Sequence, residues 1–261
     1  MENKAKSDSK KQESTPVSPA KRSKPDRKRQ KWQNCVRNQI VEPMAYVKPQ
    51  TLEELLEIIK TAGIRSCKVK AVGAGHSFSD IVQTTDYLIN CHFLDNAIEL
   101  EEDLLKSPPQ HPEPTDLKSK FTKFVHVESG MTIRRLNKYL DSKKLALINM
   151  GAYDGQTISG VISTSTHGTG ISLGPIASSV ASLIVVGEKG DVYRIEPSSG
   201  ITDPIKYKTK YPGSVLIQDN DCFNAMLVSM GCMGVFYSVI LKVSERYYLS
   251  EERYGLKGEN Y

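Results

Sequence analysis

The sequence VKAVGAGHSFSD, residues 69–80, joins a strand-like segment to a glycine-rich turn that carries a histidine. The alternation of residues up to Val72 is typical of a β-strand. Gly73 and Gly75 allow a tight turn or a close approach of the backbone to a ligand, because they lack a Cβ atom. His76 is therefore either an ordinary turn or core histidine, the commoner case for such a stretch alone, or a reactive group that the turn presents.

Two familiar phosphate-binding loops do not fit this turn. A dinucleotide fingerprint, G-x-G-x-x-G, needs a third glycine where this chain has Phe78, and a long crossover helix where only residues 76–86 precede the next strand. The turn also follows the second expected strand rather than the first. A Walker loop needs Gly-Lys-Ser or Gly-Lys-Thr, which the sequence lacks.

A second stretch, GAYDGQTISGVISTSTHGTGISLG (residues 151–174), has six glycines and eight Ser or Thr residues among its 24 positions. Glycines flanked by Ser and Thr expose backbone N–H groups to which a phosphate can bind. Taken alone, GAGHS is interpreted by default as a turn that ends a strand, and STHGTG (residues 165–170) as a plain loop. Because both stretches also carry a histidine, a two-part clamp for a phosphate or a cofactor becomes an equal alternative to plain loops.

Helical and strand patterns surround these stretches. TLEELLEIIKTAG (residues 51–63) has Thr51 as a candidate N-cap and Glu54 three residues later, the pattern of a capping box. AYVKP, CKVKAVG and YLINC predict strands around it. KFVHVES, TIRRLNKYLDSKKL and ALINMG then repeat the order of strand, helix and strand over residues 123–151. This order predicts an α+β fold of two lobes.

The rest of the chain yields a hairpin, a loop, a helix and a strand. SLIVVGEKGDVYRI (residues 182–195) predicts two strands joined through Lys189 and Gly190. Residues 197–219 are expected to form a loop, and NDCFNAMLVSMG a short helix capped by Asn220 or Asp221. We expect a tail over 1–31, a first lobe over 32–100, a surface insertion over 101–120, a second lobe over 121–246, and a tail or the start of another domain over 247–261.

The positive charge of the chain is confined to its N-terminal tail. Residues 1–31 have eleven Lys or Arg and four Asp or Glu, a net charge of +7, whereas residues 32–261 have 24 and 26, a net charge of −2. The tail composition predicts disorder, and its run KRSKPDRKRQK is either a solvated segment or a nuclear-import or polyanion-binding patch. The slightly acidic body gives no sequence support for nucleic-acid binding.

The five cysteines are scattered and show no metal-binding or redox spacing, so we expect free thiols and no metal site. The sequence shows no export signal and no apolar run long enough for a membrane helix. We therefore expect a cytoplasmic protein that does not bind a membrane, while the basic tail leaves a nuclear location open.

Several motifs in this order resemble a known family. VGAGHSFSD, VESGMTIRRLNKYL, TISGVISTSTHGTG and FNAMLVSMGCMGVFYSV, with Trp32 ahead of them, are similar to the FAD-binding (PCMH-type) domain of vanillyl-alcohol-oxidase flavoproteins. Within that group the likeness is greatest to sugar-1,4-lactone, L-gulonolactone, D-arabinono-1,4-lactone and alditol oxidases. It extends from about residue 32 to residue 245. The resemblance implies two α+β subdomains that hold FAD between them.

The resemblance also implies which residues contact the cofactor. In relatives with this pattern, the histidine that matches His76 is joined covalently to the flavin 8α-methyl carbon, and a neutral imidazole nitrogen is a suitable nucleophile for that bond. The implied FAD-binding residues are Val72, Gly73, Ala74, Gly75, His76, Ser77, Phe78, Ser159, Gly160, Ser163, Thr164, His167, Gly168, Thr169, Gly170 and Val235.

The resemblance implies an oxidase that acts on a CH–OH group of a sugar lactone or polyol, with oxygen as acceptor and hydrogen peroxide as product. In these oxidases a C-terminal cap domain binds the sugar, and residues 247–261 are too short to form one. We therefore expect a further domain or a partner chain to complete the site, and no catalytic base is assigned. The alternative is a flavin-binding module without turnover. Anion or nucleic-acid binding through the tail ranks last.

Overall fold

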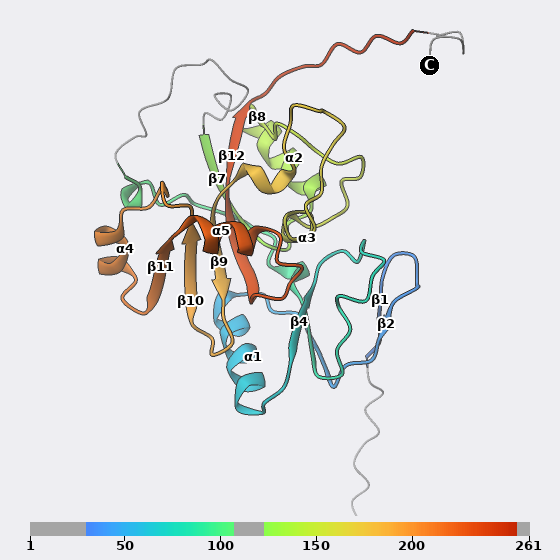
Figure 1. Ribbon diagram of the computed structural model, residues 1–261, viewed down its shortest axis with the longest axis vertical. Coiled ribbons are helices and arrows are strands. Elements are labelled where there is room, and N and C mark those ends of the chain that lie inside the picture. Colours follow the sequence, from blue (N-terminus) through green and yellow to red (C-terminus); the bar gives the residue numbers. More distant parts are fainter. Residues whose placement is uncertain (1–29, 107–122, 255–261) are drawn as a thin grey trace, which may run out of the picture.

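The computed structural model describes residues 30–106 and 123–254, which form two main β-sheets with helices around them (Figure 1). The ranges 1–29, 107–122 and 255–261 lie outside the described residues. Almost all of the expected tail and most of the expected insertion fall there. Near the start of the described chain, β1 (Trp32–Gln33) and β2 (Ile40–Val41) form a small antiparallel pair.

The first sheet has three parallel strands in the order β3-β5-β4. Its elements are β3 (Ala45–Val47), α1 (Leu52–Ile64), β4 (Val69–Val72) and β5 (Tyr87–Asn90). The N-cap prediction is confirmed, because the Thr51 side chain accepts a hydrogen bond from the Glu54 N–H. The Glu54 carboxylate accepts in turn from the Gln50 N–H at 2.8 Å, so the start of α1 is capped from both directions.

The second sheet is larger and mostly antiparallel, in the order β11-β10-β9-β12-β7-β6 with β8 beside β12. Only the β10–β11 pair is parallel among its described pairs. The strands are β6 (Ala97–Ile98), β7 (Lys123–Glu128), β8 (Leu145–Ala146), β9 (Val180–Val186), β10 (Val192–Glu196), β11 (Ser214–Gln218) and β12 (Val235–Glu245). The predicted hairpin is confirmed as β9–β10, with Gly190 at φ +76°.

Three helices cover one face of the second sheet (Figure 1). They are α2 (Ile133–Ser142), α3 (Ile158–Ser163) and α5 (Asn220–Leu227). Alternate strand residues such as Val125, Leu183 and Val239 point to these helices and form the main core with them. On the other side of the sheet, α1 packs against the ends of β9 and β12 through a second cluster that includes Val186 and Val235.

Two sequence predictions, one about a loop and one about a cap, are wrong. Residues 197–219 contain α4 (Pro204–Lys210) and β11 rather than loop alone. The N-cap of α5 is Asp219, whose side chain accepts from the Cys222 N–H at 2.8 Å, rather than Asn220 or Asp221. The sequence made no secondary-structure prediction for residues 158–163, which form α3; its six residues are too short for a periodic pattern to be visible.

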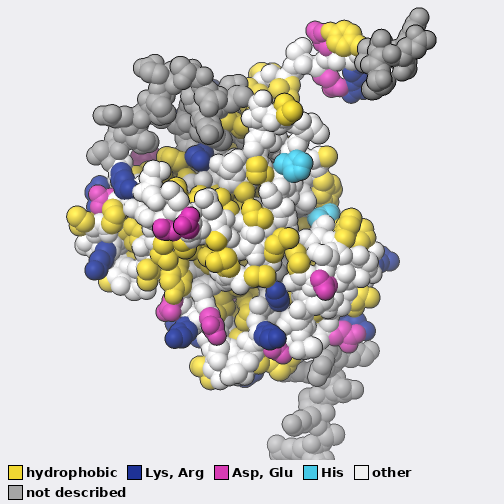
Figure 2. All heavy atoms as spheres, viewed as in Figure 1, with side chains coloured by type: hydrophobic (Ala, Val, Ile, Leu, Met, Phe, Trp, Pro, Cys, Tyr) yellow, Lys and Arg dark blue, Asp and Glu magenta, His cyan; other side chains and the backbone are white. Residues whose placement is uncertain are grey.

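On the face of the molecule shown in Figure 2, neither positive nor negative side chains dominate among the described residues. Lys and Arg side chains are interspersed with Asp and Glu side chains over the face shown in Figure 2. This agrees with the near balance of charges over residues 32–261. Among the described helices, none is both long and apolar enough to cross a membrane.

Gly130, which follows β7, packs directly against the backbone of Cys91 and Leu94, and this close packing can be tested. Its N–H donates to the Leu94 carbonyl at 2.7 Å, and a Cβ atom here would collide with the Cys91 carbonyl group and lie 2.9 Å from the Leu94 oxygen. We expect Gly130→Ala to lower the free energy of unfolding by about 3 kcal/mol, because backbone atoms cannot move aside as a side chain can.

Chemical denaturation of both proteins measures this loss. The matched control is Gly213→Ala, where a Cβ would meet no atom within 4 Å, and we expect its effect to stay within about 0.5 kcal/mol. Equal effects of the two substitutions would contradict the packing argument.

Candidate functional site

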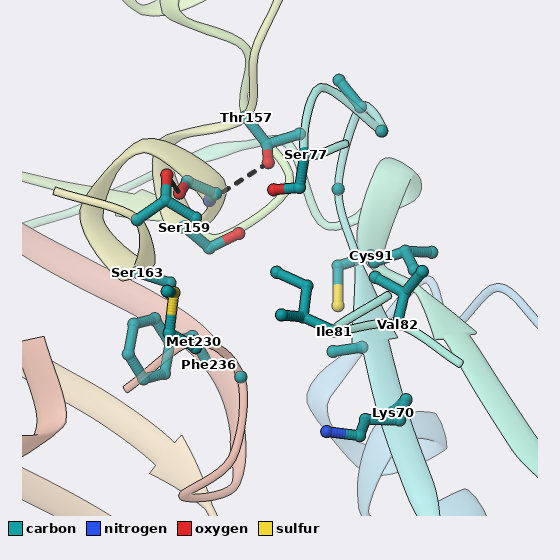
Figure 3. A pocket seen from close by; sticks show the side chains of 18 of the residues that line it. Lys70, Ser77, Ile81, Val82, Cys91, Thr157, Ser159, Ser163, Met230 and Phe236 are labelled. Carbon is teal, nitrogen blue, oxygen red and sulfur yellow. Dashed lines mark hydrogen bonds between the residues drawn. The ribbon is translucent and has the colours of Figure 1, made fainter. Parts of the chain in front are cut away.

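A pocket lies between the turn after β4 and helix α3. Residues that follow the strands of the first sheet face residues of α3 and of the turn before β12 across it. Figure 3 shows Ser77, Ile81, Val82, Cys91 and Lys70 on one wall. The opposite wall in the same view carries Thr157, Ser159, Ser163, Met230 and Phe236. The fold brings these two walls together from four segments that lie far apart in the sequence. Their proximity could not be predicted from the order of residues alone.

Glycines shape the first wall. At Gly73 a Cβ atom would collide with Oγ1 of Thr157, so the turn after β4 approaches the start of α3 closely only because the side chain is absent. Gly75 has φ +73°, and a Cβ there would lie 3.0 Å from the Trp32 ring and 3.2 Å from Cα of Asn34. The turn is held on that side by a hydrogen bond from the Cys35 N–H to the Gly75 carbonyl at 2.9 Å.

Helix α3 presents one side to the pocket and the other to the core. Ser159, Gly160 and Ser163 line the pocket, whereas Ile158, Val161 and Ile162 are buried in the main core. This division follows from the spacing of side chains around a helix. Thr157 caps the helix, and its side chain accepts from the Gly160 N–H at 3.3 Å (Figure 3).

The turn before β12 closes the second wall. Met230, Gly231 and Gly234 have φ values of +53°, +70° and +107°. A Cβ at Gly234 would lie 2.8 Å from Cγ1 of Val185 and 2.9 Å from the Val186 carbonyl oxygen. Both this lack of space and the positive φ angle therefore require glycine at this position. The turn therefore runs tightly against β9 and delivers Val235 and Phe236 to the pocket.

The described lining contains no Asp or Glu, and Lys70 and His76 are its titratable basic residues. Backbone N–H groups, hydroxyl groups and one lysine are together suited to an anionic group such as a diphosphate. The pocket also has room for a flat or phosphate-bearing ligand, because the glycines of its lining have no side chains that would occupy this space. In the described part of the chain, no cluster of His, Cys, Asp and Glu is suited to bind a metal ion.

His76, Cys91 and Lys70 are the pocket residues whose side chains have nucleophilic nitrogen or thiol groups. The His76 ring packs against Tyr153 with 4.6 Å between ring centroids, and neither of its nitrogens forms a hydrogen bond within the described residues. Cys91 is 4% exposed, and burial raises the pKa of its thiol to about 11. Cys91 is therefore protonated near neutral pH and a poor nucleophile, which leaves His76 and Lys70 as the reactive candidates of the lining.

The structure brings together most of the residues that the resemblance indicated. Val72, Gly73, Ala74, Gly75, His76, Ser77, Ser159, Gly160, Ser163, Thr164 and Val235 all line the pocket. Phe78, His167, Gly168, Thr169 and Gly170 do not line it. Phe78 is 60% exposed, and the His167 ring interacts with the neighbouring Gly168 carbonyl at 2.7 Å. The role of these five residues stays a prediction.

Sequence reasoning missed several lining residues. They are Trp32, Lys70, Ala71, Ile81, Val82, Cys91, Gln156, Thr157, Met230, Gly231, Gly234 and Phe236. The repeated glycines of SMGCMG were a usable signal for the third segment, since glycines at such spacing often mark positive φ angles. No sequence signal distinguishes Ile81 or Val82 from ordinary core residues.

Comparison with known proteins gives a family match over most of the pocket. Residues 43–196 match the family described as "FAD binding domain". This range includes both glycine-rich stretches but ends before the turn at Met230. The match agrees with a pocket lined by N–H donors and free of acidic side chains.

Three curated relatives resemble the chain over most of its length. L-gulonolactone oxidase of Mus musculus is 29% identical over 84% of this chain and 42% of that protein. D-arabinono-1,4-lactone oxidase of Candida albicans is 31% identical over 82% of this chain and 34% of that protein. L-gulono-1,4-lactone dehydrogenase of Mycobacterium tuberculosis is 30% identical, over 81% and 40%. The chain thus spans less than half the length of these relatives.

The fold also matches solved structures. Cholesterol oxidase from B. sterolicum superposes with a TM-score of 0.60 at 15% sequence identity, over 83% of this chain and 37% of that protein. At this identity the likeness concerns the fold alone. The predicted fold class, a two-lobed α+β FAD-binding domain of the vanillyl-alcohol-oxidase type, is confirmed.

The close approach of Gly73 to Thr157 is testable with a double-mutant cycle. We expect Gly73→Ala to cost about 2–3 kcal/mol through its collision with Oγ1, and Thr157→Ala about 1 kcal/mol through loss of the α3 cap. In the double variant the colliding oxygen is gone. Its cost should therefore fall short of the sum of the single costs by at least about 1 kcal/mol.

Denaturant unfolding of the four proteins measures this coupling. If the losses in free energy of unfolding from the two single substitutions add up to that of the double variant, the predicted collision between the two residues is wrong. The pair Gly213→Ala and Thr157→Ala serves as the uncoupled control, because no atom lies near a Cβ at Gly213.

Proposed function

Because the chain belongs to the FAD-binding domain family, we propose that the pocket between the β4 turn and α3 is where its FAD binds. The observation that carries this proposal is the composition of the lining: both glycine-rich stretches contribute to it, and no described lining residue is acidic. An acidic lining would repel the diphosphate, whereas N–H groups and Lys70 attract it.

The proposed contacts follow from the donors on each wall. The backbone of Gly73, Ala74 and Gly75 offers N–H groups where no large side chain intervenes. Ser159, Ser163 and Thr164 offer hydroxyl groups from α3 and its C-terminal end. Apolar side chains of Val82, Val235 and Phe236 exclude water from the same space.

When bound, FAD supplies two-electron oxidation of a CH–OH group. We propose that the substrate is a sugar lactone or a polyol, since the relatives named above are oxidases and a dehydrogenase of such lactones. Oxygen as acceptor, with hydrogen peroxide as product, is the proposal for the oxidase case. The chain's share in this activity is to hold and orient the cofactor, and the groups that bind the substrate would come from a further domain or a partner chain.

We also propose that His76 forms the covalent link to FAD. His76 lies at the pocket, its ring nitrogens are unengaged within the described residues, and the other soft nucleophile, Cys91, is kept protonated by burial. The ring is braced by Tyr153, whose contact limits its rotation. A ring held in this way loses little entropy when it forms a bond.

A second function is favoured by one specific observation. The described lining has no carboxylate, and His76, the histidine it contains, is assigned to the link. A general base to accept the substrate's hydroxyl proton is therefore missing from this wall. This supports a flavin-binding module that needs a partner for turnover, and it predicts bound flavin without peroxide production from any lactone or polyol.

Cofactor titration tests the proposed pocket. The titration uses the His76→Ala background, in which flavin is not held covalently and can be removed; we expect this chain, freed of flavin and titrated with FAD, to quench flavin fluorescence saturably. Ser163→Trp fills the pocket with a large side chain and should weaken FAD binding by roughly tenfold or more, as expected for the loss of well-packed contacts. Ser199→Trp, on the exposed turn after β10, should bind FAD like the His76→Ala chain without a second substitution. Equal affinities of the two variants would place FAD elsewhere.

Acid precipitation tests the link. Flavin should stay in the precipitate of the unaltered protein, and His76→Ala should release it to the supernatant while the native variant still binds FAD. His167→Ala, which changes the histidine of the second glycine-rich stretch outside the pocket, should keep its flavin in the precipitate. Release of all flavin from the unaltered protein, or retention by His76→Ala, would rule out the link through His76.

A further inference from the structure

The loop of residues 150–156, which precedes α3, contacts the histidine that is proposed to carry FAD. The ring of Tyr153 packs against the ring of His76, with 4.6 Å between the ring centroids and 53° between the ring planes. His76 lines the FAD pocket, whereas Tyr153 does not. Tyr153 therefore contacts the histidine without occupying space in the pocket.

The loop that carries Tyr153 is bound to the start of α2. The Arg134 N–H donates to the Asp154 carbonyl oxygen at 2.7 Å, and the Arg134 guanidinium donates to the Asp154 carboxylate through Nε at 3.2 Å and Nη2 at 2.8 Å. The Ile133 N–H donates to the Gln156 carbonyl oxygen at 2.9 Å. The hydrogen bond with Arg134 lowers the pKa of Asp154, so the carboxylate is charged at neutral pH. A two-pronged pair of this kind fixes orientation as well as distance.

Gly155 makes room for the Tyr153 ring. A Cβ atom at Gly155 would lie 2.3 Å from the Tyr153 hydroxyl oxygen and 2.5 Å from its Cζ atom, so the ring lies directly over the glycine. The φ angle of Gly155 is outside the left-handed region, so glycine is needed here for space alone. The Tyr153 hydroxyl forms no hydrogen bond within the described residues. What Tyr153 offers to His76 is therefore the contact of its ring.

This contact limits the freedom of the His76 side chain. Neither ring nitrogen of His76 forms a hydrogen bond within the described residues, so no polar contact there fixes the rotation of the imidazole about its side-chain bonds. Tyr153 is 50% exposed, so burial in a core does not account for the position of this aromatic ring. A reacting group that is oriented before the reaction loses less entropy in it.

We propose that Tyr153 is a positioning residue for the covalent attachment of FAD, and this inference rests on the proposed link through His76. The link joins a His76 ring nitrogen to the flavin 8α carbon. One proton leaves that carbon and one leaves the imidazole, and the two electrons left on the flavin pass to dioxygen, which becomes hydrogen peroxide. Tyr153 takes no part in these bond changes. It raises their rate by holding the imidazole in one orientation.

The rate of attachment tests the inference. Flavin-free chains, produced in a riboflavin-starved auxotrophic host, are mixed with FAD in air, and the flavin in the acid precipitate is followed over time. Tyr153→Ala should slow attachment roughly tenfold or more, whereas Tyr153→Phe, which keeps the ring, should stay within about twofold of the unaltered rate. Gly155→Ala displaces the ring and should also slow attachment. Tyr248→Ala, at an 83% exposed tyrosine, is the matched control and should leave the rate unchanged.

The affinity for FAD separates positioning from a structural role. In the His76→Ala background, Tyr153→Ala should leave the affinity unchanged, because Tyr153 does not line the pocket. An unchanged rate in Tyr153→Ala, equal slowing by Tyr153→Phe, or a parallel loss of affinity would overturn the inference. An unaltered chain that retains no flavin would refute the link itself, and the inference with it, while saturable binding of FAD would still support the pocket.

Nuclear magnetic resonance of the flavin-free chain gives a readout without the cofactor. The chain has five histidines, and the ring-proton signals of His76 are assigned by their absence from the His76→Ala spectrum. A neighbouring aromatic ring shifts such signals. We expect Tyr153→Ala to move them toward the positions of a freely rotating histidine, and Tyr153→Phe and Tyr248→Ala to leave them in place. Unchanged His76 signals in Tyr153→Ala would overturn the inference even if attachment is slower.

Discussion

The contact between Gly73 and Thr157 is the constraint on which the pocket depends. The backbone after β4 lies against the residue that caps α3, at a distance that no Cβ atom would permit. This contact sets how far apart the two walls can stand. Gly75 and Gly234 act in the same way at the edges, one against Trp32 and Asn34 and the other against β9. The pocket is thus built by the absence of side chains at points of backbone contact.

This construction explains the chemistry that the pocket can offer. Where glycines bring the backbone to the surface, peptide N–H groups become the main polar groups of the lining. Hydroxyls from Ser159 and Ser163 add donors without adding charge. Such a lining suits an anionic cofactor, and its described residues include no carboxylate base. The described lining thus offers groups that suit cofactor binding and none that would act as a carboxylate base.

The sequence predicted what depends on local order and missed what depends on distant contacts. Thr51 and the apolar spacing after it were enough to predict α1, because capping and helical periodicity are local. Asp219 was missed as the cap of α5, since Asn220 and Asp221 beside it have equally suitable side chains. Lys70, Cys91 and Phe236 could not be assigned to the pocket from the sequence, because they meet only when the two sheets are assembled.

Arg194 and Glu196 of β10 are a second case in which distant contacts could not be predicted from the sequence. Their spacing in VYRIE places both on one side of β10, and alone it suggests a solvent-exposed pair. The pair is buried because Thr202 and Gln218 also converge on Glu196, a contact set that the sequence does not reveal. Strand β12, separated from β10 by β9, contributes to two places: Val235 and Phe236 line the proposed FAD pocket, whereas Tyr237 and Ser238 line a separate hollow over the second sheet. Its register shifts between Phe236 and Ser238. An irregularity of this kind re-aims neighbouring side chains, so one strand can contribute to two separate places within four residues.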